Sequence, residues 1–127
     1  MKFQFSLIPI FFFMFSIHAW SIPKKPEYHN GTFIYKIYYE EQNSWMGDTV
    51  IVKIHNDRIK IYAKKVNISG IKNGELMEDG VIRQHKSGVW IISSPNSPQD
   101  VNLDHIEACR GDAPATIDFK KKIYWMC

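Results

Sequence analysis

Histidine and acidic side chains are the first residues to consider for chemistry, because they act as metal ligands and as general acids and bases. One segment groups Asp100, Asp104, His105 and Glu107, and a helix there would place Asp100 and Asp104 on one side. A zinc site needs three or four convergent nitrogen or sulfur ligands, whereas this segment offers one imidazole among carboxylates. We interpret it as a solvated surface and expect no metal and no cofactor.

Paired carboxylates occur at Glu40-Glu41 and at Glu78-Asp79. Neighbouring residues of a strand point to opposite faces of a sheet, so neither pair forms a general acid and base by itself. The sequence has no Gly-x-Ser-x-Gly nucleophile motif and no glycine-rich phosphate-binding loop. We therefore expect a protein that is not an enzyme, although missing motifs do not exclude a small hydrolase.

The elements that must position any functional side chain are strands. Residues 32–40 alternate, with Phe33, Tyr35, Ile37 and Tyr39 on one face. Residues 49–55 and 58–64 flank Asn56-Asp57, and a two-residue turn pairs Ile54 with Ile59, Val52 with Ile61 and Val50 with Ala63. Every apolar side chain of this hairpin then lies on one face, so register and pattern agree.

The second half of the chain predicts two further hairpins and a helix. Residues 81–86 and 89–94 flank the turn dipeptide Ser87-Gly88, after a possible short strand at 75–78. Residues 97–111 begin with Ser-Pro and end at a glycine, which predicts about three helical turns. Residues 116–119 and 123–126 flank three lysines, and a three-residue loop would pair Ile117 with Trp125. We therefore expect a mainly β fold: an antiparallel meander of about six to seven strands forming a small or partly open barrel, with one short helix.

A candidate binding surface lies on the face of the first hairpin opposite its apolar residues. There Lys53 would face Lys60 and His55 would face Arg58, and like charges directly opposed across strands are unfavourable unless a ligand or solvent compensates them. Lys36 extends this stripe. The same face carries Tyr38 and Tyr62 beside Ile34 and Ile51, and Trp45 is the expected exposed aromatic residue of the next loop. The alternative is an ordinary solvated face.

The first 21 residues predict export. Lys2, an apolar run from Phe3 to Ile17 and the small residues Ala19 and Ser21 are typical of a signal peptide, and the alternative is an uncleaved membrane anchor. Residues 22–127 then form a single β-rich domain that is secreted or periplasmic, without stable membrane insertion after cleavage. The net charge of +3 is too small to indicate a nucleic-acid partner.

Cys109 and Cys127 are the two cysteines of the chain. In an exported protein such a pair is usually oxidised, and closing a loop of about 19 residues contributes on the order of 3 kcal/mol of stability. Two free thiols or a redox pair are the alternatives.

The C-terminal part of the chain carries a resemblance. Gly80, the run His85-Lys86-Ser87-Gly88-Val89-Trp90-Ile91-Ile92 and the tail Ile117-Asp118-Phe119-Lys120-Lys121-Lys122-Ile123-Tyr124-Trp125-Met126-Cys127 resemble a group of short secreted bacterial proteins with no assigned function. The opening Tyr35-Lys36-Ile37 and the strand 49–55 fit that group less specifically. The resemblance implies export into an oxidising space and a bond between Cys109 and Cys127. It implies no activity and no catalytic residue.

Together these features favour a non-enzymatic binding module, such as an inhibitor or accessory subunit, that contacts a protein or an anionic ligand. The residues expected to carry binding are Lys36, Tyr38, Trp45, Lys53, Lys60 and Tyr62. The alternatives are a small-molecule carrier with a barrel cavity and a small secreted hydrolase.

Overall fold

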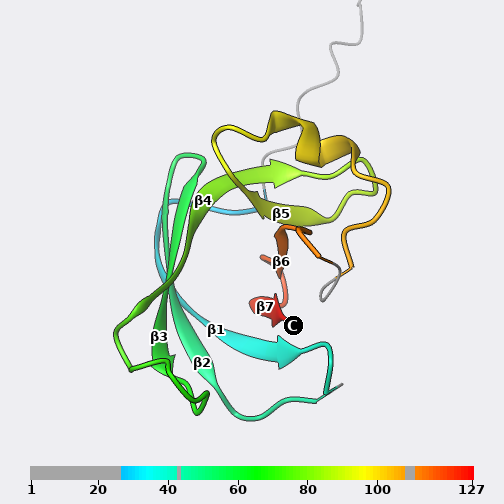
Figure 1. Cartoon of the computed structure of the whole chain (residues 1–127). Helices are drawn as coiled ribbons and strands as arrows, with labels where there is room; N and C mark the ends of the chain where they lie inside the picture. Colours follow the sequence, from blue (N-terminus) through cyan, green and yellow to red (C-terminus); the bar gives the residue numbers. More distant parts are fainter. Residues whose placement is uncertain (1–26, 43, 108–110) are drawn as a thin grey trace, which may run out of the picture.

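The structure, a computed structural model, describes residues 27–42, 44–107 and 111–127. Within them the chain forms seven strands and one short 3-10 helix (Figure 1). The elements in chain order are β1 (Gly31–Tyr39), β2 (Thr49–His55), β3 (Arg58–Lys65), β4 (Leu76–Gln84), β5 (Trp90–Ser93), η1 (Pro98–Asn102), β6 (Ala115–Asp118) and β7 (Ile123–Met126). The mainly β prediction is therefore confirmed.

The strands follow one another around a closed barrel in sequence order. Each strand is antiparallel to the next, and β1 pairs with β7 in parallel. The parallel closure follows from the strand number, because in an up-and-down meander the first and seventh strands run in the same direction. Closure leaves neither β1 nor β7 with an unpaired edge.

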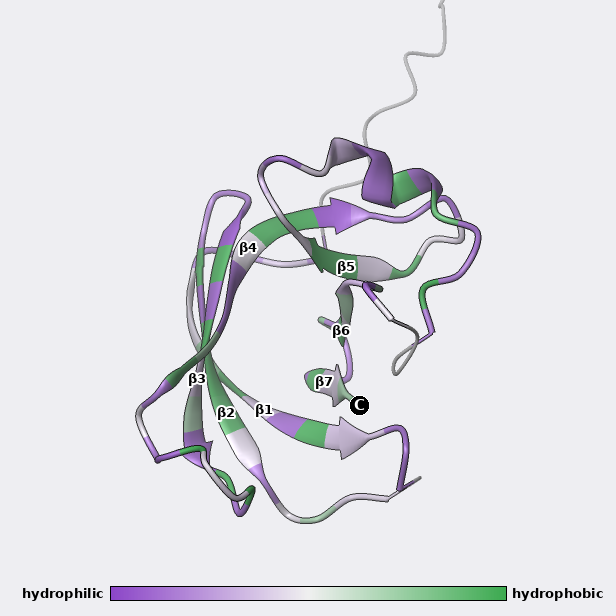
Figure 2. Ribbon diagram, viewed as in Figure 1, coloured by the Kyte–Doolittle hydropathy of each residue, from purple (hydrophilic) through white to green (hydrophobic). Residues whose placement is uncertain are grey.

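The β2–β3 hairpin has the predicted register. Val52 lies opposite Ile61 and Ile54 opposite Ile59, and all four side chains are buried. Asn56, in the turn, has a φ of 57°, the left-handed conformation that Asn tolerates better than most residues. Alternation along β1 is also as predicted, with Tyr35, Ile37 and Tyr39 buried. Polar and apolar bands alternate along these ribbons (Figure 2).

Aromatic side chains close the barrel at the end where β1 begins. Tyr28 packs against Phe119 with ring centroids 5.0 Å apart and against Trp90 at 5.4 Å, and Trp90 lies 5.8 Å from Phe119. Tyr35, inside the barrel, reaches Phe119 edge-on at 6.5 Å. These four rings fill that end with the large apolar surface that aromatic side chains bury.

β4 is longer than predicted. The short strand expected at 75–78 and the first arm of the second hairpin are one continuous strand that includes Gly80. A Cβ atom at Gly80 would lie 2.6 Å from the Ser93 carbonyl oxygen, so glycine permits β5 to approach closely there. The sequence pattern suggested a break because glycine usually interrupts a strand, whereas here it serves packing.

The β4–β5 turn is wider than the Ser87-Gly88 dipeptide alone. The His85 N–H donates to the Val89 carbonyl and the Gly88 N–H to the His85 carbonyl, both at 2.8 Å. The loop is therefore Lys86 to Gly88, with Gly88 in the left-handed conformation at φ 92°.

The β6–β7 register differs by one residue from the prediction. Ile117 lies opposite Tyr124 and Thr116 opposite Trp125, so four residues, not three, connect the strands. Asp118 accepts a hydrogen bond from the Lys121 N–H at 2.8 Å, and Lys122 has a φ of 56°. This turn tucks Phe119 into the core, places Tyr124 inside the barrel and turns Trp125 outward.

The predicted three-turn helix at 97–111 is wrong for the residues that the structure describes. η1 spans five residues, none of them buried, and its ribbon is mostly hydrophilic (Figure 2). Too few apolar side chains are available to hold an amphipathic helix against the barrel. The segment instead contacts β5, where the Ser93 hydroxyl donates to an Asp100 carboxylate oxygen at 2.7 Å.

Two predictions fall outside the described residues: the signal peptide at 1–21 and the position of Cys109. The bond between Cys109 and Cys127 therefore stays a prediction. No helix in residues 27–42, 44–107 or 111–127 has both the length and the apolar character needed to cross a membrane.

Candidate functional site

The predicted lysine pair exists. Lys53 on β2 lies directly opposite Lys60 on β3, and both side chains are exposed on the outside of the barrel. Lys60 in turn lies opposite Asp79 on β4, and Asp79 accepts a hydrogen bond from Arg58 at 3.3 Å. One carboxylate therefore lies beside this group of cations and offsets part of their repulsion.

Lys53 also contacts an aromatic ring. Its ammonium group lies 5.1 Å from the centre of the Tyr62 ring, a cation–π distance. Because Tyr62 belongs to β3 and Lys53 to β2, the contact joins the two strands on the outer face. Two of the predicted binding residues thus touch each other directly.

An apolar row crosses four strands beside this contact. Ile34, Ile51, Tyr62 and Leu76 are successive cross-strand neighbours on β1 to β4. Ile34 is 53% exposed and Leu76 is 46% exposed, while Ile51 and Tyr62 are half-buried. Sequence reasoning missed Leu76, because the start of β4 lies in a stretch that reads as irregular.

Lysines border the row on both sides. Lys53 and Lys60 lie on one side, and Lys36, Lys64 and Lys65 lie near Thr49 on the other, all of them exposed. We call these nine residues the lysine-flanked face, comprising Ile34, Ile51, Tyr62 and Leu76 with Lys36, Lys53, Lys60, Lys64 and Lys65. An apolar centre inside a charged rim is the usual anatomy of a protein-binding surface.

Tyr38 and Trp45 belong to a separate aromatic cluster. The Tyr38 ring lies 4.9 Å from Trp45 and 6.4 Å from Trp125, edge-on in both cases. Sequence reasoning missed Trp125, because the predicted register turned it inward. The structure therefore divides the predicted site: Lys36, Lys53, Lys60 and Tyr62 lie on the lysine-flanked face, while Tyr38 and Trp45 join Trp125.

A small pocket of about 290 Å³ connects the two groups, since Trp45, Lys36 and Asp48 all line it. Asp48 is buried, and its Oδ2 accepts the Tyr39 hydroxyl at 2.5 Å and the Asn67 N–H at 3.2 Å. Burial, and then Asp48, raise the pKa of Tyr39 well above the ordinary value. Asp48 thus links the loop between β1 and β2 to Tyr39 on β1 and to Asn67 in the loop after β3.

Glu78 and Asp79 point to opposite faces, as predicted. Asp79 lies outside, whereas Glu78 lies opposite the buried Ile61 and accepts a hydrogen bond from the Tyr124 hydroxyl at 3.4 Å. Burial raises the pKa of Glu78, and the Tyr124 hydrogen bond opposes part of that rise. Burial also raises the pKa of Tyr124 and, together with Asp118, that of Tyr35 to about 12.

The histidine and acidic side chains around η1 form separate pairs and do not converge on one point. Asp104 pairs with Lys86 at 3.2 Å, and His105 lies 3.7 Å from Glu107. His85 is buried: its Nε2–H donates to the Leu103 carbonyl at 2.6 Å and its Nδ1 accepts the Ser87 N–H at 3.1 Å. Within the part of the chain that the structure describes, no group of three or more His, Cys, Asp or Glu residues could hold a metal ion.

Comparison with known proteins adds no relative to this description. No protein-family model matches the chain, and no curated protein or solved structure is detectably similar to it.

Proposed function

We propose that this chain is a secreted or periplasmic binding module that docks a partner protein on the lysine-flanked face. The observation that carries the proposal is the apolar row Ile34–Ile51–Tyr62–Leu76, bordered on both sides by lysines. Exposed aliphatic side chains in the middle of a sheet face lose water favourably when a partner covers them. An inhibitor or an accessory subunit would use such a surface.

The partner surface should be apolar at its centre and acidic around it. The five lysines of the rim would steer an acidic partner toward the face and speed its association. The like-charge contact between Lys53 and Lys60 is unfavourable in the free protein, and a partner carboxylate placed between the two ammonium groups would relieve it. The face has few aromatic side chains for base stacking, which favours a protein over nucleic acid.

The arrangement gives less support to the other two functions. A carrier needs an apolar cavity, but Tyr35, Ile37, Val52, Ile61 and Tyr124 point into the barrel, and an aromatic cluster fills one end. The buried His85 is a poor candidate for the base of a hydrolase, because a histidine base needs a free ring nitrogen and both of its ring nitrogens are engaged.

Export and a bond between Cys109 and Cys127 complete the proposal. The bond would anchor the end of the chain directly after β7, the strand that closes the barrel against β1. A domain of this size has a modest core, so a covalent constraint near the closure would contribute a large share of its stability.

The proposal is tested by immobilising the mature protein and recovering bound proteins from the secreted fraction of its native host. We expect the wild-type protein to retain one partner, and the Ile34→Ser and Tyr62→Ala variants to lose it. Asn96→Ala, at an exposed position beyond β5, is the matched control and should retain it. Equal recovery by all variants would contradict the proposal.

A further inference from the structure

A second surface with the opposite charge lies on another side of the barrel. A groove of about 700 Å³ is lined by residues of β5, β6 and β7 and of the loops beside them, and Trp90, Trp125, Val89 and Ile106 supply apolar side chains to its lining. Val89 is 41% exposed, and the other three side chains are half-buried. The proposed function makes no use of any of these residues.

Five carboxylates surround the apolar walls: Glu27, Glu40, Asp104, Glu107 and Asp118. They come from four separate segments of the chain, so the fold, and not a local acidic run, brings them together. Among the described residues that line the groove, Lys120 is the one lysine or arginine. The groove is therefore strongly acidic in a chain whose formal net charge is +3.

Within the part of the chain that the structure describes, the ion pairs of Glu27, Asp104 and Glu107 are all exposed to solvent. Glu27 pairs with Lys120 at 3.2 Å and Asp104 with Lys86 at 3.2 Å, and in both pairs at least one side chain is three-quarters or more exposed. Exposed pairs of this kind contribute little stability, so a better-placed cation can compete for either carboxylate. Trp90 also donates its indole N–H to Glu27 at 3.2 Å, which ties an acidic side chain to an aromatic wall.

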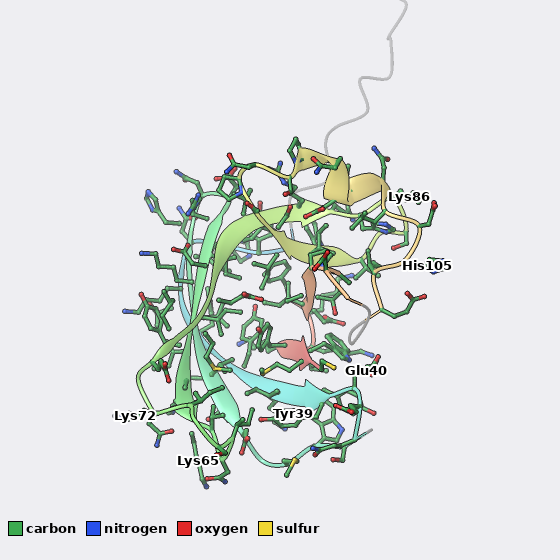
Figure 3. All side chains as sticks on the ribbon, in the orientation of Figure 1. Tyr39, Glu40, Lys65, Lys72, Lys86 and His105 are labelled. Atoms are coloured by element: carbon green, nitrogen blue, oxygen red, sulfur yellow. The ribbon has the colours of Figure 1, made fainter. Side chains whose placement is uncertain are left out.

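The groove and the lysine-flanked face adjoin at β1 and β7, where Lys36 lies opposite Ile123 and Tyr38 opposite Trp125. Their other parts lie at different ends of the molecule: Glu40 and Lys86 are on one side, whereas Lys65 is at the opposite end (Figure 3).

We propose that the groove binds an extended basic segment of a partner protein in which lysine or arginine alternates with apolar residues. The apolar side chains would pack against Val89, Ile106 and the two tryptophans, and the cations would approach the carboxylates around them. A cation over the face of Trp90 or Trp125 gains a cation–π contact in addition. Charge complementarity selects this occupant over an acidic or uncharged one.

The test uses blocked pentapeptides as probes and the NMR signals of the tryptophan indole N–H groups as the readout. We expect Lys-Leu-Lys-Leu-Lys to shift the Trp90 and Trp125 signals saturably and more weakly as salt is added. Glu-Leu-Glu-Leu-Glu should cause no shift, and Lys-Ser-Lys-Ser-Lys should bind at least about tenfold more weakly because it lacks the apolar contacts.

Matched variants locate the site. Trp125→Ala should weaken binding of Lys-Leu-Lys-Leu-Lys about tenfold, and Glu40→Lys should weaken it at least threefold, because each removes a feature of the groove. Glu41→Lys changes a neighbouring acidic residue that does not line the groove, and should leave the affinity unchanged.

Three outcomes would overturn the proposal. The first is the absence of saturable shifts at low salt. The second is equal binding of the leucine and serine peptides, which would indicate unspecific attraction. The third is self-association of the protein that both Glu40→Lys and Lys60→Glu abolish, which would make a second copy the occupant. Since none of these tests uses partner recovery on the lysine-flanked face, they leave the proposed function to its own experiment.

Discussion

The side chains of Lys53 and Lys60 stand directly opposite each other on β2 and β3, and the ammonium group of Lys53 lies 5.1 Å from the centre of the Tyr62 ring. The free protein therefore keeps two like charges together at a position where either residue could carry the opposite charge. Such an arrangement costs stability in isolation and is suited to an acidic partner.

Lys53→Glu should raise the free energy of unfolding by about 0.5 kcal/mol, because an attractive cross-strand pair with Lys60 replaces a repulsive one. The loss of the contact between Lys53 and Tyr62 offsets part of the gain. Urea denaturation measures the change, and Lys53→Gln, which loses both the repulsion and the Tyr62 contact but gains no attraction to Lys60, should be less stable than Lys53→Glu. A loss of 1 kcal/mol or more would show that the two lysines do not oppose each other.

Tyr124→Ala should destabilise the fold by about 3 to 5 kcal/mol, whereas Trp125→Ala should cost less than about 1.5 kcal/mol. The difference follows from the observed β6–β7 register, which places Tyr124 inside the barrel at 3% exposure and Trp125 outside. Denaturation of the two variants under identical conditions makes the comparison. A larger loss of stability for Trp125→Ala than for Tyr124→Ala would support instead the register in which Ile117 pairs with Trp125.

Glu78→Gln should make the protein more stable than wild type at pH 7 and leave it unchanged near pH 4. Burial raises the pKa of Glu78 above its ordinary value of 4.5, so the folded state favours the protonated carboxyl. The stability linked to this group is present below pH 4.5 and is lost as the pH rises through the folded-state pKa. Unfolding measured across this range, with Glu41→Gln as an exposed control, tests the effect; a wild-type curve that Glu78→Gln does not alter would refute it.

The free energy of unfolding should fall steeply with pH in alkaline solution. Burial raises the pKa of Tyr35 from 10.0 to about 12, and the pKa values of Tyr39 and Tyr124 also rise. Stability linked to the three neutral phenols is present below pH 10 and is lost as the pH rises through their folded-state pKa values. Ultraviolet titration of tyrosine, followed together with circular dichroism, should show Tyr35, Tyr39 and Tyr124 ionising only as the fold is lost; ionisation of all tyrosines without unfolding would contradict the burial of these three.

The β2–β3 hairpin and β1 could be predicted because local signals agree there. The Asn56-Asp57 turn sets the register, and alternation sets the face, so Val52, Ile54 and Ile61 were placed correctly. The β6–β7 register was wrong by one residue, because Asp118 and Lys122 form a four-residue turn where the lysine run suggested three. That one-residue difference is why Trp125 was missed as an outward-facing aromatic residue.

The candidate site was predicted in part. Lys53, Lys60, Tyr62 and Lys36 lie on one face because alternation in a correct hairpin determines their direction. Leu76 was missed, since its place beside Tyr62 depends on a β-bulge between Ile61 and Tyr62 in the β3–β4 pairing. The acidic groove could not be foreseen from the sequence at all, because its carboxylates come from segments that only barrel closure brings together.

Photo-crosslinking from the lysine-flanked face tests the central claim most directly. A photoreactive amino acid placed at position 34, the β1 end of the apolar row, is activated in the secreted fraction of the native host. The account predicts a covalent adduct with one partner protein, lost with Lys53→Glu or Lys60→Glu and absent when the same amino acid replaces the exposed Asn96. No adduct from position 34, or the same adducts from both positions, would contradict the claim that this face binds a partner.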